Sequence, residues 1–243
     1  MDAIRPPILL ICSVELEAAP IHALLAGSRA IEIASTDCVS GTVSGVPIIL
    51  LVGGMGKTNA AHALSAVLAL HRVSMIIGFG VAGAYLRSGL EPGAIALASS
   101  EVYGDEGVRT SSGWIDTAAI GIPLARVGAN DFYNEFPVDA RELARAQRRL
   151  CEAGIDARVG RFATVSCCSG TAERGNELAA RFNAICETME GAAYAHIAAL
   201  HQTPFLEVRA VSNLVEDRDT SRWRLPEAAA EAARAATIIA GAK

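Results

Sequence analysis

Apolar and polar positions along the chain alternate in blocks that predict strands followed by helices. Short continuous apolar runs are typical of strands buried on both faces, and segments with helical composition or periodicity separate them. The predicted strands cover residues 8–12, 75–79, 95–102, 157–167 and 205–212, and residues 38–51 are predicted to form a hairpin with its turn at 44–47. The predicted helices cover residues 15–25, 56–71, 138–153, 171–182, 191–201 and 226–240.

Two segments lack a regular pattern. Residues 80–92 are rich in glycine and predict a loop at a strand end, whereas residues 103–137 predict a long surface excursion. The alternation elsewhere predicts a three-layer α/β sandwich with a mostly parallel, mixed central sheet, in which ligands bind outside the carboxyl ends of the strands. We find no repeat or linker, so one domain over residues 1–243 is the simplest interpretation.

Composition narrows the class of partner. The chain has 243 residues, of which 51% are hydrophobic and 19% charged, and this supports a large buried core. Its net charge of −5 and its scattered basic residues argue against nucleic acid and favour a small molecule. No apolar run reaches the roughly 18 residues of a membrane span, and residues 1–7 lack the features of a signal peptide. We therefore expect a cytoplasmic protein without a membrane partner.

The cysteines show neither metal-ligand spacing nor a dense disulfide framework. We interpret them as reduced, mostly buried thiols, and we expect neither a metal nor an organic cofactor. The six cysteines are Cys12, Cys38, Cys151, Cys167, Cys168 and Cys186.

Acidic and amide side chains occur where predicted strands end. Glu190 opens a predicted helix, where the helix dipole favours its charge, and a carboxylate can accept hydrogen bonds from both vicinal hydroxyls of a ribose. A first-turn glutamate that only compensates the dipole is an equal alternative. Glu17, Gly83 and Asn213 also fall at predicted carboxyl ends, so a common cleft would bring the four together.

The segment Gly53-Gly-Met-Gly-Lys-Thr58 matches only the end of a phosphate-binding P-loop. That motif needs a glycine five positions before Gly56, and Leu51 stands there. We interpret the segment as a tight turn between a strand and a helix.

Five segments together resemble the nucleoside phosphorylase and nucleosidase superfamily from the first strand to about Trp223. They are Cys12-Ser-Val-Glu-Leu-Glu17, Gly80-Val-Ala-Gly83, Val165-Ser-Cys-Cys-Ser-Gly-Thr171, Glu187-Thr-Met-Glu190 and Arg209-Ala-Val-Ser-Asn213. Within the superfamily the chain looks like the branch of methylthioadenosine/S-adenosylhomocysteine nucleosidases, and still more like the futalosine hydrolases of menaquinone biosynthesis. The resemblance implies a nucleoside phosphorylase-like fold, a nucleoside substrate and a homodimer or larger homo-oligomer.

The resemblance also implies roles for individual residues. Glu17 would activate a water molecule, Glu190 would hold the ribose hydroxyls, and Met189 would pack on the sugar. The purine would contact Gly170 and Thr171, and Asn213 would recognise it as it leaves. Arg218, Arg222 or Arg224 would pair with a carboxylate on the 5′ side of the ribose, although the last two fit solvated surface arginines better. Further substrate contacts are implied for Val81, Ala82, Gly83 and Ser212.

Two departures from the family pattern refine the expected chemistry. Relatives that release adenine carry aspartate at the position of Asn213, whose amide N–H groups suit the acceptors N7 and O6 of a 6-oxopurine. The glycine-rich segment and the first helix start offer Val81, Glu15 and Glu17 where phosphate binding calls for cations. The sequence therefore predicts a hydrolase that releases hypoxanthine from futalosine. The alternatives are a methylthioadenosine/S-adenosylhomocysteine or aminodeoxyfutalosine nucleosidase, a purine-nucleoside phosphorylase and a non-catalytic nucleoside-binding module.

Overall fold

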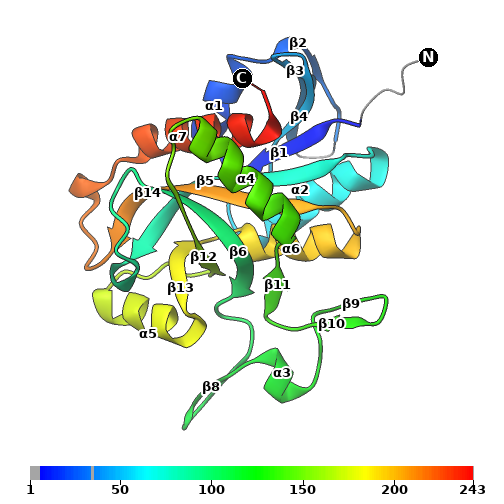
Figure 1. The fold of residues 1–243 in the computed structure, drawn as a ribbon. Helices are drawn as coiled ribbons and strands as arrows, with labels where there is room; N and C mark the ends of the chain where they lie inside the picture. Colours follow the sequence, from blue (N-terminus) through cyan, green and yellow to red (C-terminus); the bar gives the residue numbers. More distant parts are fainter. Residues whose placement is uncertain (1–5, 34–35, 243) are drawn as a thin grey trace.

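A computed structural model describes residues 6–33 and 36–242, and these residues alternate between strands and helices around a central sheet (Figure 1). The strands and α-helices are, in chain order, β1 (Ile8–Cys12), α1 (Glu15–His22), β2 (Ala26–Ala30), β3 (Asp37–Val43), β4 (Val46–Val52), α2 (Lys57–Leu70), β5 (Met75–Tyr85), β6 (Ile95–Tyr103), β7 (Val108–Thr110), β8 (Gly113–Ile115), α3 (Thr117–Ile120), β9 (Ala125–Val127), β10 (Asn130–Phe132), β11 (Glu135–Pro137), α4 (Ala140–Glu152), β12 (Ala157–Thr164), α5 (Ala172–Phe182), β13 (Ala184–Thr188), α6 (Gly191–Leu200), β14 (Phe205–Val215) and α7 (Leu225–Ala240). Short 3₁₀ turns, η1 (Leu86–Ser88) and η2 (Thr220–Arg222), follow β5 and β14.

The central sheet is mixed and partly closes on itself. The sheet has ten strands. Nine of them follow the order β11-β6-β12-β13-β5-β1-β4-β3-β2, and the tenth, β14, pairs with both β5 and β6. β14 runs parallel to β5 and antiparallel to β6, so β5, β14, β6, β12 and β13 form a continuous ring of paired strands. The ring encloses mostly small buried side chains, including Ala82, Ala84, Ala96 and Ala98. A narrow ring leaves room only for such residues.

Successive residues of β1 point to opposite faces of the sheet, and helices cover both faces. Leu10 belongs to the buried cluster that includes α1, α4 and α7, whereas Leu9 and Ile11 belong to the cluster that includes α2 and α6. This explains the continuous apolar run in the sequence, because a strand buried on both faces has no polar side. The predicted three-layer α/β fold is confirmed.

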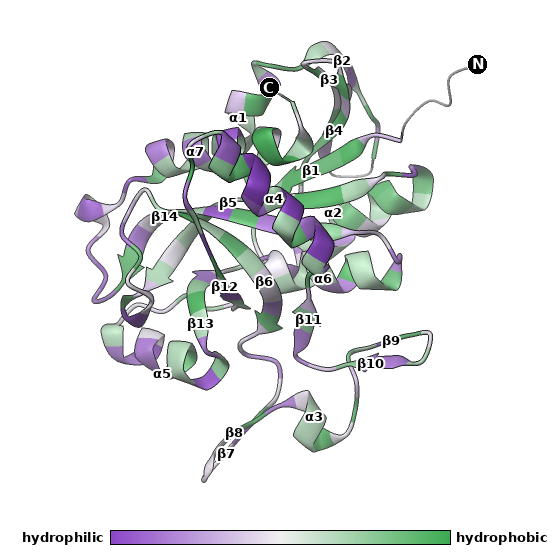
Figure 2. Ribbon diagram, in the orientation of Figure 1, coloured by the Kyte–Doolittle hydropathy of each residue, from purple (hydrophilic) through white to green (hydrophobic). Residues whose placement is uncertain are grey.

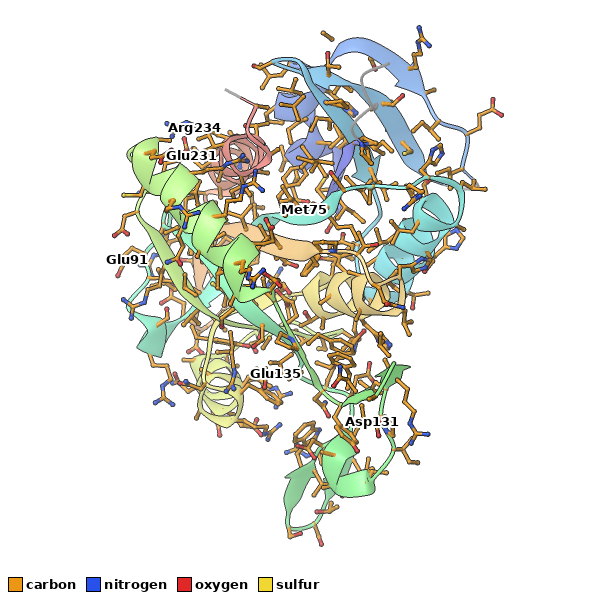
Figure 3. All side chains as sticks on the ribbon, turned by 45° about the vertical axis from the view of Figure 1, so that its right-hand side comes forward. Met75, Glu91, Asp131, Glu135, Glu231 and Arg234 are labelled. Atoms are coloured by element: carbon orange, nitrogen blue, oxygen red, sulfur yellow. The ribbon has the colours of Figure 1, made fainter. Side chains whose placement is uncertain are left out.

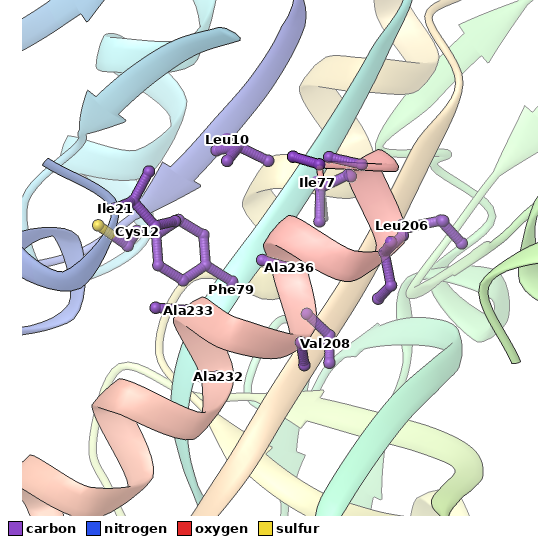
Figure 4. Packing of buried hydrophobic residues seen from close by; sticks show 14 of the residues in the cluster. Leu10, Cys12, Ile21, Ile77, Phe79, Leu206, Val208, Ala232, Ala233 and Ala236 are labelled. Carbon is purple, nitrogen blue, oxygen red and sulfur yellow. The ribbon is translucent and has the colours of Figure 1, made fainter. Parts of the chain in front are cut away.

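The α7 helix packs closely on the strands because its inner face consists of small residues. Ala232, Ala233 and Ala236 lie over Ile77 and Phe79 of β5 (Figure 4). Hydrophilic residues lie on the outer sides of the helices, most visibly on α4, while the central strands are largely hydrophobic (Figure 2).

Surface pairs on the outer side of α7 are exposed to solvent. Glu231 and Arg234 lie one helical turn apart there, with 3.3 Å between Oε2 and Nη1 (Figure 3). An exposed ion pair of this type contributes about 0 to 1 kcal/mol to stability. The stability of α7 therefore comes from its buried alanine face.

Residues 80–92 were predicted to be a loop, and this is wrong for the first half. β5 continues to Tyr85 because β14 pairs with it along its whole length, from Ile76 opposite Phe205 to Tyr85 opposite Val215. The glycines that suggest a loop serve instead to admit neighbouring side chains. β14 likewise extends beyond its predicted end, so Asn213 lies inside the strand.

Outside residues 103–137, the sequence pattern failed to predict two of the strands, β2 and β13. β2 is exposed at every position, and therefore has no apolar face to detect. β13 occupies the short stretch between α5 and the Glu190 segment. The predicted helices agree with the structure apart from their ends, since α1 stops at His22 rather than residue 25.

The excursion at residues 103–137 has more regular structure than the sequence predicted. It contains the hairpins β7–β8 and β9–β10 and the short helix α3, which project away from the sheet at the bottom of Figure 1. Asp131 of β10 lies within this projection (Figure 3). The excursion ends in β11, which adds an antiparallel edge to β6 and buries Phe136.

The prediction of mostly buried thiols is right for half of the cysteines. Cys12, Cys38 and Cys186 are buried, whereas Cys151, Cys167 and Cys168 are exposed, and all six are free. Across residues 6–33 and 36–242 no helix combines the length and apolarity needed to cross a membrane. The segment Met1–Arg5, which entered the argument about a signal peptide, lies outside the described residues.

Candidate active site

A cavity of about 320 Å³ opens where β5, β13 and β14 approach the starts of α1 and α6. Its inner part is polar and contains two glutamates and an arginine, and its outer part is largely apolar. The lining residues are Ser13, Val14, Glu17, Met55, Val81, Ala82, Gly83, Cys168, Ser169, Glu187, Thr188, Met189, Glu190, Arg209, Ser212, Asn213, Val215, Arg218, Trp223 and Leu225.

Glu17 lies at the inner end of the cavity with 3% of its surface exposed. Its Oε2 accepts hydrogen bonds from the backbone N–H of Ser13 at 2.9 Å and of Val14 at 3.4 Å, and its Oε1 accepts one from Val81 N–H at 2.9 Å. The carboxylate therefore caps its own helix and still has a lone pair free for a ligand. Burial raises the pKa of Glu17, against the opposing effect of Arg209.

Glu15 does not reach the cavity. Its exposed carboxylate lies 2.9 Å from Nδ1 of His22 at the other end of α1. Of the two acids at the start of α1, Glu17 alone both caps the helix and lines the cavity.

Gly80 makes room for the inner carboxylate. Its backbone has a φ of +153°, and a Cβ atom there would overlap Oε1 of Glu17 and lie 2.7 Å from Nη1 of Arg209. A larger side chain at this point must displace the Glu17 carboxylate or the Arg209 guanidinium. The glycine in the middle of β5 is thus a consequence of the charged groups beside it.

Glu190 lies at the start of α6 with 4% of its surface exposed. Its Oε1 accepts a hydrogen bond from Gly56 N–H at 2.9 Å. The turn that resembles the end of a P-loop therefore holds a carboxylate instead of a phosphate. Gly54 and Gly56 have φ values of +84° and +88°, which glycine adopts readily and other residues avoid.

Arg209 is the charge that joins the two glutamates, and only 1% of its surface is exposed. Its Nε donates to Oε1 of Glu207 at 2.7 Å and its Nη1 donates to Val81 O at 3.2 Å. Nη2 lies 3.6 Å from Oε2 of Glu190. Although burial disfavours the charged form, the carboxylates of Glu207, Glu190 and Glu17 raise the pKa of Arg209, so it stays a cation.

Asn213 is presented to the cavity by an irregularity in β14. The pairing of β14 with β5 shifts register between Val211 and Asn213, so Ser212 is an extra residue that turns the strand locally. The hydroxyl of Ser212 donates to Oδ1 of Asn213 at 2.8 Å, and Nδ2 of Asn213 donates to Leu214 O at 3.0 Å. These two bonds orient the amide and leave its second N–H for a ligand.

Glu187 holds the segment that forms one wall of the cavity. Its carboxylate accepts hydrogen bonds from Ser169 N–H at 2.7 Å, from Ser169 Oγ at 2.6 Å and from the hydroxyl of Tyr85 at 3.1 Å. The sequence did not identify Glu187 or Ser169 as site residues.

Gly170 and Thr171, which were predicted to contact the purine, do not line the cavity. The preceding residues Cys168 and Ser169 do. Thr171 caps α5 by accepting a hydrogen bond from Arg174 N–H at 3.2 Å, and Gly170 O accepts one from Arg218 N–H at 3.2 Å. Both therefore support the wall rather than face the cavity.

The outer part of the cavity combines apolar side chains with one cation. Met189, Met55 and Trp223 line it, and the guanidinium carbon of Arg218 lies 4.6 Å from the centre of the Trp223 ring. Stacking on an aromatic ring restrains an exposed arginine without using its hydrogen-bond donors. Arg218 can therefore pair with an anionic group near the opening.

Nine of the eleven predicted site residues line this one cavity. The exceptions are Gly170 and Thr171, and Arg209 is the main residue that the predictions omitted. A signal for it exists in the sequence, because Glu207 and Arg209 interrupt the apolar run of β14, and charged residues are rarely buried unless paired. The assembled cavity offers acceptors at its inner end, an amide donor on one side and apolar walls, which suits a ligand with hydroxyl groups and a flat heterocycle.

Known proteins resemble this chain over most of its length. Residues 7–242 match the protein family described as the phosphorylase superfamily. The chain is 35% identical over 196 residues to the futalosine hydrolase of Thermus thermophilus, which covers 79% of this chain and 81% of that protein. It is 30% identical over 224 residues to the 5′-methylthioadenosine/S-adenosylhomocysteine nucleosidase of Geobacillus thermodenitrificans, which covers 91% of this chain and 90% of that protein.

A solved structure shows the same fold. The 5′-methylthioadenosine/S-adenosylhomocysteine nucleosidase of Neisseria meningitidis, in complex with methylthio-immucillin-A, superposes with a TM-score of 0.83 at 22% identity. The superposition covers 96% of this chain and 98% of that chain.

We predict that Gly80→Ala destabilises the protein by more than the roughly 1 to 3 kcal/mol expected for an unfavourable backbone conformation alone. The added Cβ must displace Glu17 and Arg209 from each other. The matched control is Gly93→Ala, where φ is +99° and nothing lies within 4 Å of the added atom. Urea unfolding of both variants measures the difference, and equal losses would show that Gly80 is not required by the neighbouring charges.

Proposed function

The chain belongs to the phosphorylase superfamily and is a hydrolase acting on N-glycosyl bonds, and we propose that its substrate is futalosine, from which it releases hypoxanthine. Family and class of reaction agree with the prediction from the sequence. The choice of substrate rests on Asn213 and is supported by the identity to the futalosine hydrolase of Thermus thermophilus.

Asn213 favours a 6-oxopurine because its available group is a donor. The hydrogen bonds with Ser212 and Leu214 leave one N–H of the amide for a ligand, while Oδ1 already accepts one hydrogen bond and keeps a single lone pair. A carbonyl oxygen at purine position 6 accepts such a hydrogen bond. A 6-amino group is itself a donor and cannot accept one from the amide N–H. Simultaneous donation to N7 and O6 would require the bond to Leu214 O to be given up. The preference therefore rests on a single hydrogen bond.

Glu17 is the proposed base that takes a proton from the attacking water. Three of the lone-pair directions of its carboxylate are used by backbone N–H groups, and one remains for the water. The backbone bonds fix the carboxylate, so little reorganisation accompanies the reaction. The oxygen of the water bonds to the anomeric carbon while one of its protons passes to Glu17, and the bond from that carbon to the purine nitrogen breaks. The purine takes up a proton from solvent, and Glu17 returns its proton to solvent, so the overall reaction consumes one water.

Glu190 is proposed to bind the ribose hydroxyls and to stabilise positive charge on the sugar. Gly56 N–H and the Arg209 cation hold its carboxylate at the inner end of the cavity. A carboxylate near a sugar ring that becomes cationic in the transition state interacts more strongly with that state than with the substrate. Met189 supplies an apolar surface beside it.

Water rather than phosphate is the proposed nucleophile. The inner end of the cavity contains Glu17 and Glu190, and its one buried cation, Arg209, is already bound to carboxylates. A phosphate there would face two negative charges and no free cation. Arg218 lies in the outer part, where we propose that it pairs with the aromatic carboxylate on the 5′ side of futalosine.

A methylthioadenosine/S-adenosylhomocysteine nucleosidase is the second candidate function. It is favoured by the longer alignment with the enzyme of Geobacillus thermodenitrificans, and by the apolar side chains of Met55 and Trp223, which suit a thioether substituent. The two candidates differ in the purine that each expects at Asn213.

Incubation with a panel of nucleosides tests the proposal. The protein is mixed with futalosine, inosine, methylthioadenosine or S-adenosylhomocysteine, with and without phosphate, and the released bases are identified by chromatography. We expect hypoxanthine from futalosine without any need for phosphate, because Asn213 donates to O6. Adenine release without hypoxanthine would establish the second candidate instead, and Glu17→Gln purified in parallel controls for nucleosidases of the expression host.

We predict that Glu17→Gln lowers kcat by about 10²-fold or more while futalosine still binds, because an amide cannot take the proton from water. Glu15→Gln is the matched control, since Glu15 is exposed on the same helix, and should leave turnover unchanged. Turnover and equilibrium binding are measured separately. Full turnover in folded Glu17→Gln would remove Glu17 from the mechanism.

The pH dependence follows from the same residue. Because the ionised form is the base and burial raises the pKa of Glu17, kcat/KM of the unmodified protein should fall, as pH decreases, at a higher pH than an ordinary glutamate would cause. The residual activity of Glu17→Gln should lack this acidic limb. An identical acidic limb in both proteins would assign it to another group.

We predict that Asn213→Asp raises the kcat/KM of methylthioadenosine relative to futalosine by about tenfold or more. Nδ2 of Asn213 lies 3.0 Å from Leu214 O. In Asn213→Asp an oxygen replaces Nδ2, so two acceptor oxygens would face each other. This environment favours the protonated acid, which donates its one O–H to Leu214 O and keeps acceptor lone pairs for the 6-amino group of an aminopurine. Asn213→Ala should weaken both reactions without reversing the order, and an unchanged ratio in Asn213→Asp would refute the argument from Asn213.

A further inference from the structure

Two glutamates lie together beneath the cavity without forming part of its lining. Glu101 on β6 and Glu207 on β14 both have 0% of their surface exposed. Oε1 of Glu207 accepts the hydrogen bond from Arg209 Nε at 2.7 Å, and Oε2 of Glu101 accepts one from the hydroxyl of Thr164 at 3.4 Å. The two carboxyl groups are close enough that the charge of Glu207 acts on Glu101.

Glycines at two positions make room for this pair. A Cβ on Gly191, the first residue of α6, would overlap Oε2 of Glu101 and lie 2.7 Å from Oε2 of Glu207. A Cβ on Gly78 would lie 3.2 Å from the same oxygen of Glu207. The backbone directly after Glu190 is therefore in contact with both carboxyl groups.

Burial and the neighbouring charges favour one proton on the pair. Burial raises the pKa of Glu101 well above its ordinary value, and the neighbouring charge of Glu207 raises it further. Burial also raises the pKa of Glu207, but the Arg209 cation opposes this effect. Since only Glu207 is hydrogen-bonded to the cation, the proton is favoured on Glu101 and the negative charge on Glu207.

The other ionisable groups around the pair come from every element packed on it. Among the described residues, Arg209 is the only cation next to the pair. The carboxylates of Glu17 and Glu190 also act on Arg209. Cys186 on β13 and Tyr194 on α6 also face the pair, and burial raises the pKa of both well above neutrality, so they stay uncharged.

Such an arrangement is costly for stability alone. The attraction between a carboxylate and a guanidinium offsets only part of the free energy needed to remove both from water. Well-packed apolar residues of similar volume often stabilise a protein as much or more. Buried groups with shifted pKa values are concentrated at functional sites. Arg209, which lines the cavity, is hydrogen-bonded to Glu207, and Gly191 in the first turn of α6 lies against both carboxyl groups.

We propose that Glu101 and Glu207 are positioning residues, in which the carboxylic acid of Glu101 holds the Glu207 carboxylate against Arg209 and so fixes the guanidinium between Glu17 and Glu190. The inference rests on the roles proposed for Glu17 and Glu190, and applies to whichever nucleoside is cleaved. Loss of the shared proton places two negative charges side by side, which pulls the guanidinium away from Glu190 and Glu17. Activity should therefore decline at high pH.

Substitutions at Glu101 separate this role from simple packing. Glu101→Gln keeps the shape and a donor to Glu207 but carries no ionisable proton, whereas Glu101→Leu keeps the volume and loses the donor. We expect Glu101→Gln to retain kcat within about threefold at neutral pH, and Glu101→Leu to lose about tenfold or more in kcat with KM changed less. Thermal unfolding of both variants reports whether stability follows activity.

The pH profile is the decisive readout. The unmodified protein should lose kcat as pH rises through the pKa of the pair, and Glu101→Gln should keep its activity over the same range. Glu152→Gln, an exposed substitution on α4, is the control and should reproduce the unmodified profile. A basic limb that is unchanged in Glu101→Gln, or equal kcat in Glu101→Gln and Glu101→Leu, would overturn the proposal.

A spectroscopic measurement tests the proton without any substrate. Infrared difference spectra of the unmodified protein and Glu101→Gln at neutral pH should show the loss of one protonated carboxyl C=O stretch, and its absence would overturn the proposal. The outcomes also separate the two levels of inference. If no nucleoside is cleaved by the unmodified protein, the proposed function fails, whereas turnover with an unaltered profile in Glu101→Gln refutes only the positioning role.

Discussion

The guanidinium of Arg209 lies almost entirely out of water, and the arrangement of the site follows from the need to compensate its charge. Glu207 binds its Nε, Glu190 lies beside its Nη2, and the carbonyl of Val81 accepts from its Nη1. An isolated charge in a protein interior is strongly unfavourable, so these partners must surround it. They come from β5, β14 and the start of α6, and the charge therefore links the sheet to the helix that presents Glu190.

The same constraint explains why β5 and the start of α6 are rich in glycine. Gly78, Gly80 and Gly191 each stand where a Cβ atom would meet a carboxylate or the guanidinium. A strand of this composition has low intrinsic strand propensity, and it persists because β1, β13 and β14 pair with it. Backbone pairing thus stabilises a strand whose glycines leave space for the charged groups.

The inner and outer parts of the cavity offer different groups to a ligand. Its inner end holds fixed carboxylates, which suits the ribose and the attacking water, because hydrogen bonds that are already oriented need little rearrangement during the reaction. The Ser212 bulge and the bond to Leu214 fix the orientation of the Asn213 amide at one side, where one N–H remains for a ligand. The outer part contains Met55, Trp223 and Arg218.

The sequence by itself determined the layered fold and most of the cavity. Apolar runs and helical segments are local signals, and the carboxyl ends of parallel strands meet at one edge, so Glu17, Glu190 and Asn213 could be brought together without coordinates. Only the tertiary structure decided that β14 pairs with both β5 and β6, that Ser212 is an inserted residue, and that Glu101 meets Glu207 beneath Arg209. Those features depend on contacts between segments about a hundred residues apart, which no local pattern of apolar and polar positions encodes.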